Sequence, residues 1–302
     1  MHFLLLLCTV LSLAACDRKP SGPKTAFNGE VALGYVKTQL AFGPRIPGTE
    51  GARQTGDWIT AQMRLRADSV AEQRWNHVTA KGDTLPMRNI LARFRPTATE
   101  RVLYIAHWDT RPFADFSSNP ADRKLPVPGA NDGASGVALL IAVADVLKGT
   151  PPAYGVDMLF VDGEDYGQFG PPVVDALIGS TWFASHLPSP GYQPIFGVLW
   201  DMIGDRNLNI FQEGYSSQQA PEIVARVWGM AEELGYGSYF ISRNGGPIMD
   251  DHVPLLQKGL RVIDVIDIDF DHHHRPTDTF DKVSAKSLQI VGDVATALVT
   301  GR

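Results

Sequence analysis

The sequence has few cysteines, no excess of basic residues and no apolar run long enough to span a bilayer comfortably. Its 302 residues include two cysteines, and 27 lysines and arginines against 33 acidic residues give a formal net charge of −6. The acidic balance argues against nucleic acid or an anionic membrane surface as a partner. No internal repeat is visible, and the 44% of hydrophobic residues suffice for a substantial core. The length then favours one large domain.

The N-terminal segment has the features of an export signal. The apolar run Phe3–Leu13 leads into Leu13-Ala14-Ala15-Cys16, and small residues before a cysteine resemble the cleavage site of bacterial lipoproteins. We therefore expect residues 1–15 to be a signal peptide and Cys16 to carry a lipid that is the protein's only membrane contact. An ordinary secretory signal with an incidental cysteine is the alternative.

The signal also indicates where the protein resides and what stabilises it. A lipoprotein of this kind is exported and anchored to a bacterial membrane, where it faces the periplasm or the cell exterior. Residues 16–26 are polar and typical of a flexible tether, and residues 27–302 would form a single α/β domain. Because Cys8 would be lost with the signal, no disulfide could form within the mature chain. Its stability must come from the apolar core or from a bound metal.

Short apolar runs alternate with segments of helical spacing through most of the chain. The runs that end in acidic or histidine residues are Arg101–Asp109, Val156–Asp165, Ile195–Asp201 and Arg261–Asp269. The helical segments are Phe27–Phe42, Gly48–Leu65, Gly133–Leu147, Ala176–His186, Ala220–Leu234 and Ser284–Val299. This alternation predicts an α/β three-layer sandwich, with a central mixed, mostly parallel sheet flanked by helices. Ser69–Trp75 and Asn89–Phe94 would pair at an antiparallel edge.

The polar ends of the four runs predict a functional site. Open α/β sheets bind ligands beyond the carboxyl ends of their strands, so these acids and histidines would meet at one edge of the sheet. A metal ion is the simplest reason to gather them there. The loops Thr110–Asn131 and Tyr166–Val174 follow two of the strands, and long loops of this kind are usually functional or mobile.

Two acidic segments are candidates for metal binding. Asp132 lies in Ala130–Gly136 at a loop-to-helix junction, where a helix N-cap and a metal ligand are equally good interpretations. Asp162, Glu164 and Asp165 follow the apolar residues MLFV, and carboxylates this close repel one another unless a cation or protons lie among them. A solvated acidic turn is the alternative, but the apolar lead-in places the cluster at the edge of the core. One carboxylate could bind a metal while its neighbour transfers protons.

Histidines supply further candidates. The run His272-His273-His274 follows a β-type segment and precedes Asp278-Thr279, which we expect to begin a helix, so at least one imidazole should face the site. Two carboxylates, one imidazole and an open fourth position would make a catalytic zinc site.

Three other segments carry ligand-type residues with an equally plain alternative. His107 and Asp201 could hold a second metal, or could orient ligands and substrate. Taken alone, His107 reads as a buried core histidine. For Asp250-Asp251-His252, the alternative is a helix cap before Val253–Gln257.

Seven segments together resemble a known family. In chain order they are HWDT, PGANDGASG, DGED, LIGS, LWDMIG, DDHVPLLQKG and HHHRPTD. Their order and approximate spacing resemble the bacterial leucyl-aminopeptidase-like zinc exopeptidases, from about residue 30 to the C-terminus. Within that superfamily the chain is most similar to the animal-type glutaminyl cyclases. The long loop between Asp165 and Gly179, the segment Asp250–Leu256 and the segment Leu199–Gly204 carry this closer similarity.

The resemblance implies a role for each matching residue. The zinc ligands would be Asp132, Asp165 and His274, with Glu164 as the general acid/base, Asp201 and Asp250 as hydrogen-bonding partners of the substrate, and Ile248 and His273 in the substrate pocket. Three positions depart from the pattern of the animal enzymes. Asp165 stands where glutamate is usual, Asp264 stands where they have histidine, and His273 stands where they have tryptophan. These departures bear more on the reaction than on zinc binding.

The resemblance leaves three functions open. As a glutaminyl cyclase, the protein would use one Zn²⁺ to convert the N-terminal glutamine of peptides or proteins to pyroglutamate, with release of ammonia. As a zinc aminopeptidase, it would hold two Zn²⁺ ions, with His107 and Asp201 at the second ion and Asp132 bridging both. A non-catalytic lipoprotein that binds peptides is the third reading, and retention of Glu164 and of all the ligand positions speaks against it.

Overall fold

The computed structural model describes residues 24–301. The predicted signal peptide and the predicted lipid attachment at Cys16 lie outside these residues. At the end of the predicted tether, the backbone N–H groups of Lys24 and Thr25 both donate to the carboxylate of Asp293. None of the helices among residues 24–301 combines the length and the apolarity that crossing a membrane would take.

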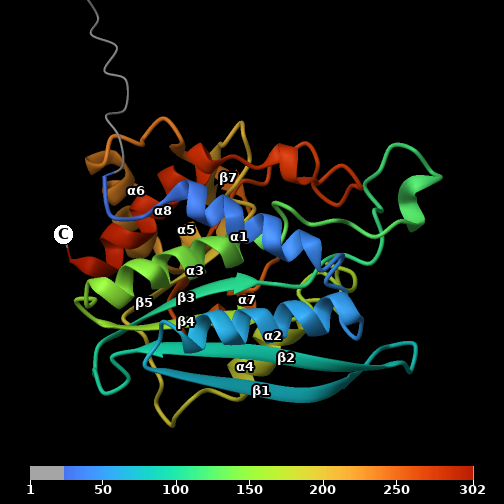
Figure 1. Cartoon of the computed structure of the whole chain (residues 1–302), viewed down its shortest axis with the longest axis horizontal. Helices are drawn as coiled ribbons and strands as arrows, with labels where there is room; N and C mark the ends of the chain where they lie inside the picture. The colour runs from blue at the N-terminus through green and yellow to red at the C-terminus, as the bar shows by residue number, and fades with distance from the viewer. Residues whose placement is uncertain (1–23, 302) are drawn as a thin grey trace, which may run out of the picture.

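A six-stranded sheet in the order β1-β2-β4-β3-β5-β8 forms the centre of the molecule (Figure 1). The strands are β1 (Ser69–Val78), β2 (Thr84–Phe94), β3 (Arg101–His107), β4 (Gly155–Val161), β5 (Phe196–Asp201) and β8 (Val262–Ile266). β3, β4, β5 and β8 are parallel, whereas β1 and β2 are antiparallel to their neighbours at one edge. The predicted fold class is therefore confirmed, including the antiparallel edge.

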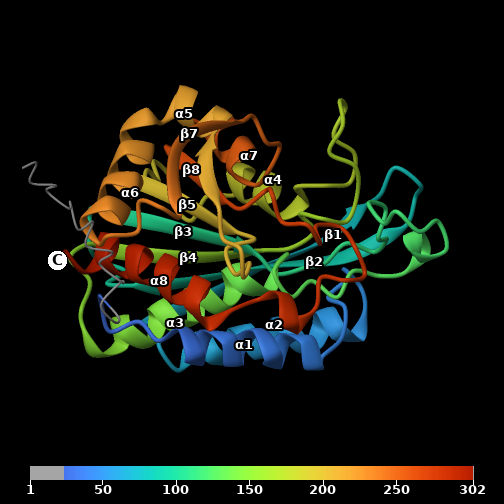
Figure 2. The same cartoon turned by 90° about the horizontal axis from the view of Figure 1, so that it is seen from above.

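Helices cover both faces of the sheet, as Figure 2 shows. One layer contains α1 (Gly29–Ala41), α2 (Glu50–Arg64), α3 (Ala134–Gly149) and α8 (Ala285–Thr300). The other contains α4 (Ile178–Ser185), α5 (Gly214–Gln219) and α7 (His252–Gln257), while α6 (Pro221–Glu233) packs against both β8 and α8. Helical spacing predicted most of these, and the apolar, Ala- and Val-rich composition predicted α3. α5 was not predicted, and α7 was expected only as the helix that Asp250–His252 would cap; both have six residues and are too short to show a period.

The structure also contains a two-stranded sheet that the sequence did not predict. β6 (Ile210–Glu213) and β7 (Phe240–Gly246) form a parallel pair with shifts in register. β7 ends in the residues Asn-Gly-Gly, which favour turns, so local propensity pointed away from a strand.

The crossover helix α3 packs directly on the strands that carry the site. A Cβ added at Gly136 would overlap the carbonyl oxygen of Trp200 in β5 and lie 3.0 Å from the Cβ of Ala106 in β3. Backbone cannot yield as a flexible side chain can, so we expect Gly136→Ala to lower the free energy of unfolding by about 1–3 kcal/mol. Urea titration followed by circular dichroism measures this change.

Gly34 in α1 provides the matched control. An added Cβ there meets no atom within 4 Å, so Gly34→Ala should stabilise the protein by about 0.5–1 kcal/mol through helix propensity alone. Equal effects of the two substitutions would contradict the close packing of α3 on the sheet.

Candidate metal and catalytic site

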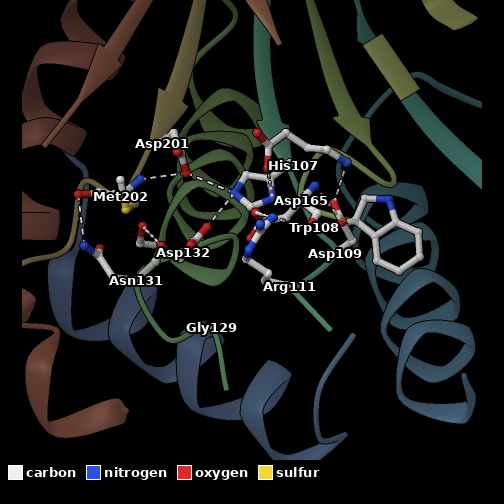
Figure 3. A network of polar contacts seen from close by, with 12 residues as sticks. His107, Trp108, Asp109, Arg111, Gly129, Asn131, Asp132, Asp165, Asp201 and Met202 are labelled. Atoms are coloured by element: carbon white, nitrogen blue, oxygen red, sulfur yellow. Dashed lines mark hydrogen bonds and ion pairs between the residues drawn. The ribbon is translucent and has the colours of Figure 1, made fainter. Parts of the chain in front are cut away.

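The carboxyl ends of the parallel strands bring the predicted acids and histidines together. His107 is the last residue of β3, Glu164 and Asp165 follow β4, and Asp201 ends β5. His274 lies in the loop that follows β8. Figure 3 shows Asp132 and Asp201 pointing at His107 from two sides, with Asp165 close by.

The helix-cap interpretation of Asp132 is wrong. The N-cap position of α3 is Gly133, with φ of 91°, and no side chain caps this helix. A Cβ at Gly133 would lie 2.6 Å from the carbonyl oxygen of Asp109, so glycine is required here. The Asp132 carboxylate is 3% exposed and turns towards the histidines, which leaves the ligand interpretation.

The expectation that Asp278-Thr279 begins a helix is confirmed at Thr279, which is the N-cap residue of the short 3₁₀-helix η2 (Phe280–Lys282). Asp278 itself caps neither η2 nor α8, whose N-cap is Ser284. Instead, the carboxylate of Asp278 accepts from the backbone N–H groups of Asn131 and Asp132, at 2.9 and 3.1 Å. Asp278 thus holds the loop that presents Asp132.

One group of ligand-type atoms surrounds His274. Its Nε2 lies 2.9 Å from Asp165 Oδ1 and 3.6 Å from Asp132 Oδ2. Asp132, His273 and His274 also offer ligand atoms within 4.8 Å of one another. Asp132 Oδ2, Asp165 Oδ2 and His274 Nδ1 are buried without a hydrogen-bond partner. Two carboxylates with unsatisfied oxygens and an imidazole whose Nε2 faces them fit a zinc ion.

A second group shares Asp132 with the first. His107 Nε2 lies 3.2 Å from Asp132 Oδ1 and 3.0 Å from Asp201 Oδ1, and all three residues are buried. Their ligand atoms lie within 4.8 Å of one another, as a second metal would require. Asp201 Oδ1 also accepts from the backbone N–H of Met202, so this oxygen already faces two nitrogens. Although burial alone lowers the pKa of His107, the charges of Asp201 and Glu164 outweigh it and raise that pKa.

Glu164 is held beside both groups. Its backbone N–H and that of Asp165 donate to the two oxygens of Asp109, each at 3.1 Å. Its Oε2 lies 3.6 Å from His107 Nδ1. Burial and the charge of Asp165 raise the pKa of Glu164 well above its ordinary value, although His107 opposes this. A carboxyl group with a raised pKa suits general acid/base catalysis.

Asp165 and His274 each shift the pKa of the other. Burial opposes ionisation of Asp165, but the charge of His274 outweighs it and holds the pKa of Asp165 below its usual range. Burial likewise disfavours the His274 imidazolium, and the charge of Asp165 outweighs it and raises the pKa of His274. His274 has a left-handed backbone with φ of 50°, which is strained for a residue other than glycine and is common at functional sites.

Two buried arginines support the site and were missed by the sequence analysis. Arg45 donates to the carbonyl oxygens of Pro128 and Gly129 at 2.6 Å each, and burial lowers its pKa to about 10. Arg111 donates to the carbonyl oxygens of Asp165 and Gly167. Arg45 lies in a proline-flanked turn and Arg111 in a loop, where no periodicity marks a residue as buried.

A cavity of about 190 Å³ opens above these groups, and we call it the inner cavity. Of the predicted site residues, those that line it are Asp132, Glu164, Asp201, Ile248, Asp250, His273 and His274. His107 and Asp165 are each 1% exposed and lie beneath this lining. Phe116 and Phe169 complete the wall from two loops, and the sequence analysis did not single them out. The cavity is smaller than the roughly 300–1,000 Å³ of sites for drug-sized ligands, so it suits a single residue.

A third group of buried ligand-type residues includes Asp250, which lines the inner cavity. Asp250, His252 and Asp264 offer ligand atoms within 4.8 Å of one another. Burial first, then neighbouring carboxylates, raise the pKa values of Asp250 and Asp264 well above the ordinary range. The alternative of a helix cap before Val253–Gln257 is confirmed in position, because Asp251 is the N-cap residue of α7, but the Asp251 side chain makes no capping hydrogen bond.

Comparison with curated proteins identifies relatives of two kinds. The aminopeptidase YwaD of Bacillus subtilis is 26% identical over 293 residues, which cover 90% of this chain and 57% of the relative. The glutaminyl-peptide cyclotransferase of Bos taurus is 26% identical over 257 residues, which cover 75% of this chain and 69% of the relative. The chain thus spans little more than half the length of the aminopeptidase.

A solved structure gives a more extensive match. The glutaminyl cyclase of Porphyromonas gingivalis is 38% identical, and the superposition has a TM-score of 0.86 and covers 90% of this chain and 97% of that one. The resemblance drawn from the seven segments is confirmed, and the zinc-dependent exopeptidases among the solved neighbours imply zinc here without giving the number of ions. The model of peptidase family M28 matches residues 89–299, and the chain therefore belongs to this family.

Proposed function

We propose that this protein is a zinc-dependent glutaminyl-peptide cyclotransferase that acts on the N-termini of peptides or proteins. The observation that carries the proposal is the inner cavity, where Glu164, Asp201 and Asp250 converge on a space for one residue. Cyclisation requires a glutamine side chain to fold back onto its own α-amino group, and a site with room for about one residue favours this conformation and limits competing water. The extensive match to the glutaminyl cyclase of Porphyromonas gingivalis supports the same reaction.

The proposed ligands for zinc are Asp132, Asp165 and His274. When bound, zinc supplies a Lewis acid that polarises the side-chain amide carbonyl of the substrate. Three side chains hold the backbone of these ligands. Asp109 accepts from the N–H of Asp165, and Arg111 donates to the carbonyl oxygen of Asp165. Asp278 accepts from the N–H of Asp132. Such support sets the position of short carboxylates, which matters because Asp165 is one methylene shorter than glutamate.

Glu164 carries the proton in this proposal. As the α-amino nitrogen attacks the side-chain carbonyl carbon, Glu164 takes a proton from that nitrogen. The new carbon–nitrogen bond closes the five-membered ring, the bond to the amide nitrogen breaks, and Glu164 returns the proton to the departing ammonia. Asp201 and Asp250 line the same cavity, and we assign them hydrogen bonds to the substrate's amino and amide groups.

A zinc aminopeptidase is the second candidate, favoured by the group His107, Asp132 and Asp201. These residues would hold the second ion that two-metal exopeptidases use, and Glu164 would activate a water molecule. The cyclase is preferred because the match to the glutaminyl cyclase of Porphyromonas gingivalis covers 97% of that chain, whereas the match to the aminopeptidase of Bacillus subtilis covers 57% of that relative.

Product analysis separates the two reactions. We expect the purified protein to release ammonia from Gln-Gly-amide and to form the pyroglutamyl product, with little free leucine from Leu-Gly-amide. Zinc content should be measured on the same sample, with one ion per chain expected. Rapid release of leucine together with two tightly held ions would contradict the cyclase and favour the aminopeptidase.

A further inference from the structure

A second, larger cavity lies next to the inner cavity and has no role in the proposed reaction. It has a volume of about 590 Å³, and we call it the outer cavity. Three segments line it: the turn that joins β1 and β2 at residues 79–83, the loop at residues 111–115, and the loop at residues 166–175. In Figure 2 these segments project from the same end of the molecule, beyond the ends of β1 and β2.

One layer of side chains separates the two cavities. The Arg111 guanidinium, which lines the outer cavity, lies 5.6 Å from the ring centre of Phe169, which lines the inner cavity. The Phe169 ring lies 6.2 Å from that of His274. Asp115 lines the outer cavity, and its Oδ1 lies 3.9 Å from His274 Nδ1. A molecule bound at the inner cavity therefore needs to cross only this layer to reach the outer one.

Exposed apolar side chains lie along both cavities and on the loop between them. Phe116 lines the inner cavity and is 53% exposed, whereas Phe113 lines the outer cavity and is 55% exposed. Val173 is 37% exposed on the loop that lies between the cavities. Exposed apolar side chains that lie together often mark a site where a partner or ligand binds.

The charges of the outer cavity are largely compensated. Arg111 pairs with Asp115 at 2.7 Å, and Asp175 lies 2.8 Å from His77 Nε2 and accepts from the N–H of Ala80. The other charged residues of the lining, Lys81 and Asp83, have opposite signs. The outer cavity therefore has no strong electrostatic field of one sign. Phe113 and Tyr166 give it an aromatic surface. This chemistry suits an apolar or aromatic side chain better than a charged one.

We propose that the outer cavity binds residues that follow the N-terminal residue of a peptide substrate, and that it favours an aromatic side chain at the third to fifth position. This inference rests on the proposed function, because it places the N-terminal residue in the inner cavity. An extended chain advances roughly 3.3–3.6 Å per residue, so two to four residues beyond the first cross a layer of side chains. Phe113 is then a specificity-determining residue.

Peptide length and sequence test the proposal. Wild-type protein is assayed with Gln-Gly-amide and with pentapeptides Gln-Gly-Gly-Gly-Gly-amide that carry one phenylalanine at position three, four or five. We expect one phenylalanine peptide to have a kcat/KM about 10-fold above the all-glycine peptide, mainly through KM, because contacts far from the reacting atoms stabilise ground state and transition state alike.

Two variants test whether the preference for phenylalanine depends on the outer cavity. Phe113→Ala should remove most of the 10-fold preference and keep the kcat/KM for Gln-Gly-amide. Leu65→Ala, which removes a 64% exposed apolar side chain at the end of α2, should keep both values. If no position prefers phenylalanine while the dipeptide is still turned over, the inference is wrong and the proposed function stands. An equal loss on dipeptide and pentapeptide in Phe113→Ala would also overturn it. If wild-type protein turns over neither substrate, the proposed function fails and the inference fails with it.

Discussion

Glu164→Gln should reduce turnover of a glutaminyl peptide by about 10²–10⁴-fold while the protein keeps its zinc. Glutamine has nearly the same shape, so the hydrogen bonds from the backbone of Glu164 and Asp165 to Asp109 persist. What is lost is the group that takes the proton from the amine and returns it to ammonia, and positioned acid/base groups contribute about this much. Ammonia release under saturating substrate measures kcat, and atomic absorption measures the zinc.

Glu222→Gln is the matched control for this substitution. Glu222 is an exposed residue of α6 that pairs with Arg261, and it lies outside both cavities. It should keep wild-type kcat and zinc content. An unchanged kcat in Glu164→Gln would remove Glu164 from the mechanism, whereas loss of zinc would reassign it as a ligand.

His274→Ala should weaken zinc binding by more than about 100-fold, the upper limit for residues that merely support a ligand. The substitution removes a ligand and leaves the carboxylates of Asp132 and Asp165 to repel each other in a buried position. Competition with a zinc-binding dye gives the affinity. A thermal scan gives a second measure, because added zinc should no longer raise the melting temperature.

The neighbouring histidine makes this test specific. His273 belongs to the same group of possible ligands as Asp132 and His274, but we assign it to the substrate pocket. His273→Ala should therefore keep zinc and raise KM. If His273→Ala loses zinc and His274→Ala keeps full occupancy, the two roles must be exchanged.

The fold could be predicted because its elements carry strong local patterns. β3, β4, β5 and β8 are short apolar runs whose residues are fully buried, and buried parallel strands need this composition. Helices such as α2 are long enough to show their spacing, and the apolar run of α3 is too long for a strand. The short helix α7 and the strand β7 have no such signal, since packing against neighbours decides their conformation.

The site was predictable to the extent that it follows strand ends. Glu164, Asp165 and Asp201 come directly after apolar runs, so the topology of a parallel sheet brings them to one edge. The roles of Arg45 and Asp278 could not be predicted in this way. Arg45 is 83 positions from Pro128, and Asp278 is 147 positions from Asn131, so only the folded chain brings these partners together.

By itself, the sequence determined the α/β architecture and the set of acids and histidines at the ends of the strands. Periodicity and strand composition are local properties, and the order of a parallel sheet then places the strand ends together. Only the tertiary structure decided that Asp132 faces both His107 and His274 instead of capping α3. It also decided that Phe113 and Phe169 lie beside the site. Such contacts join loops distant in the sequence, and their geometry depends on how every intervening element packs.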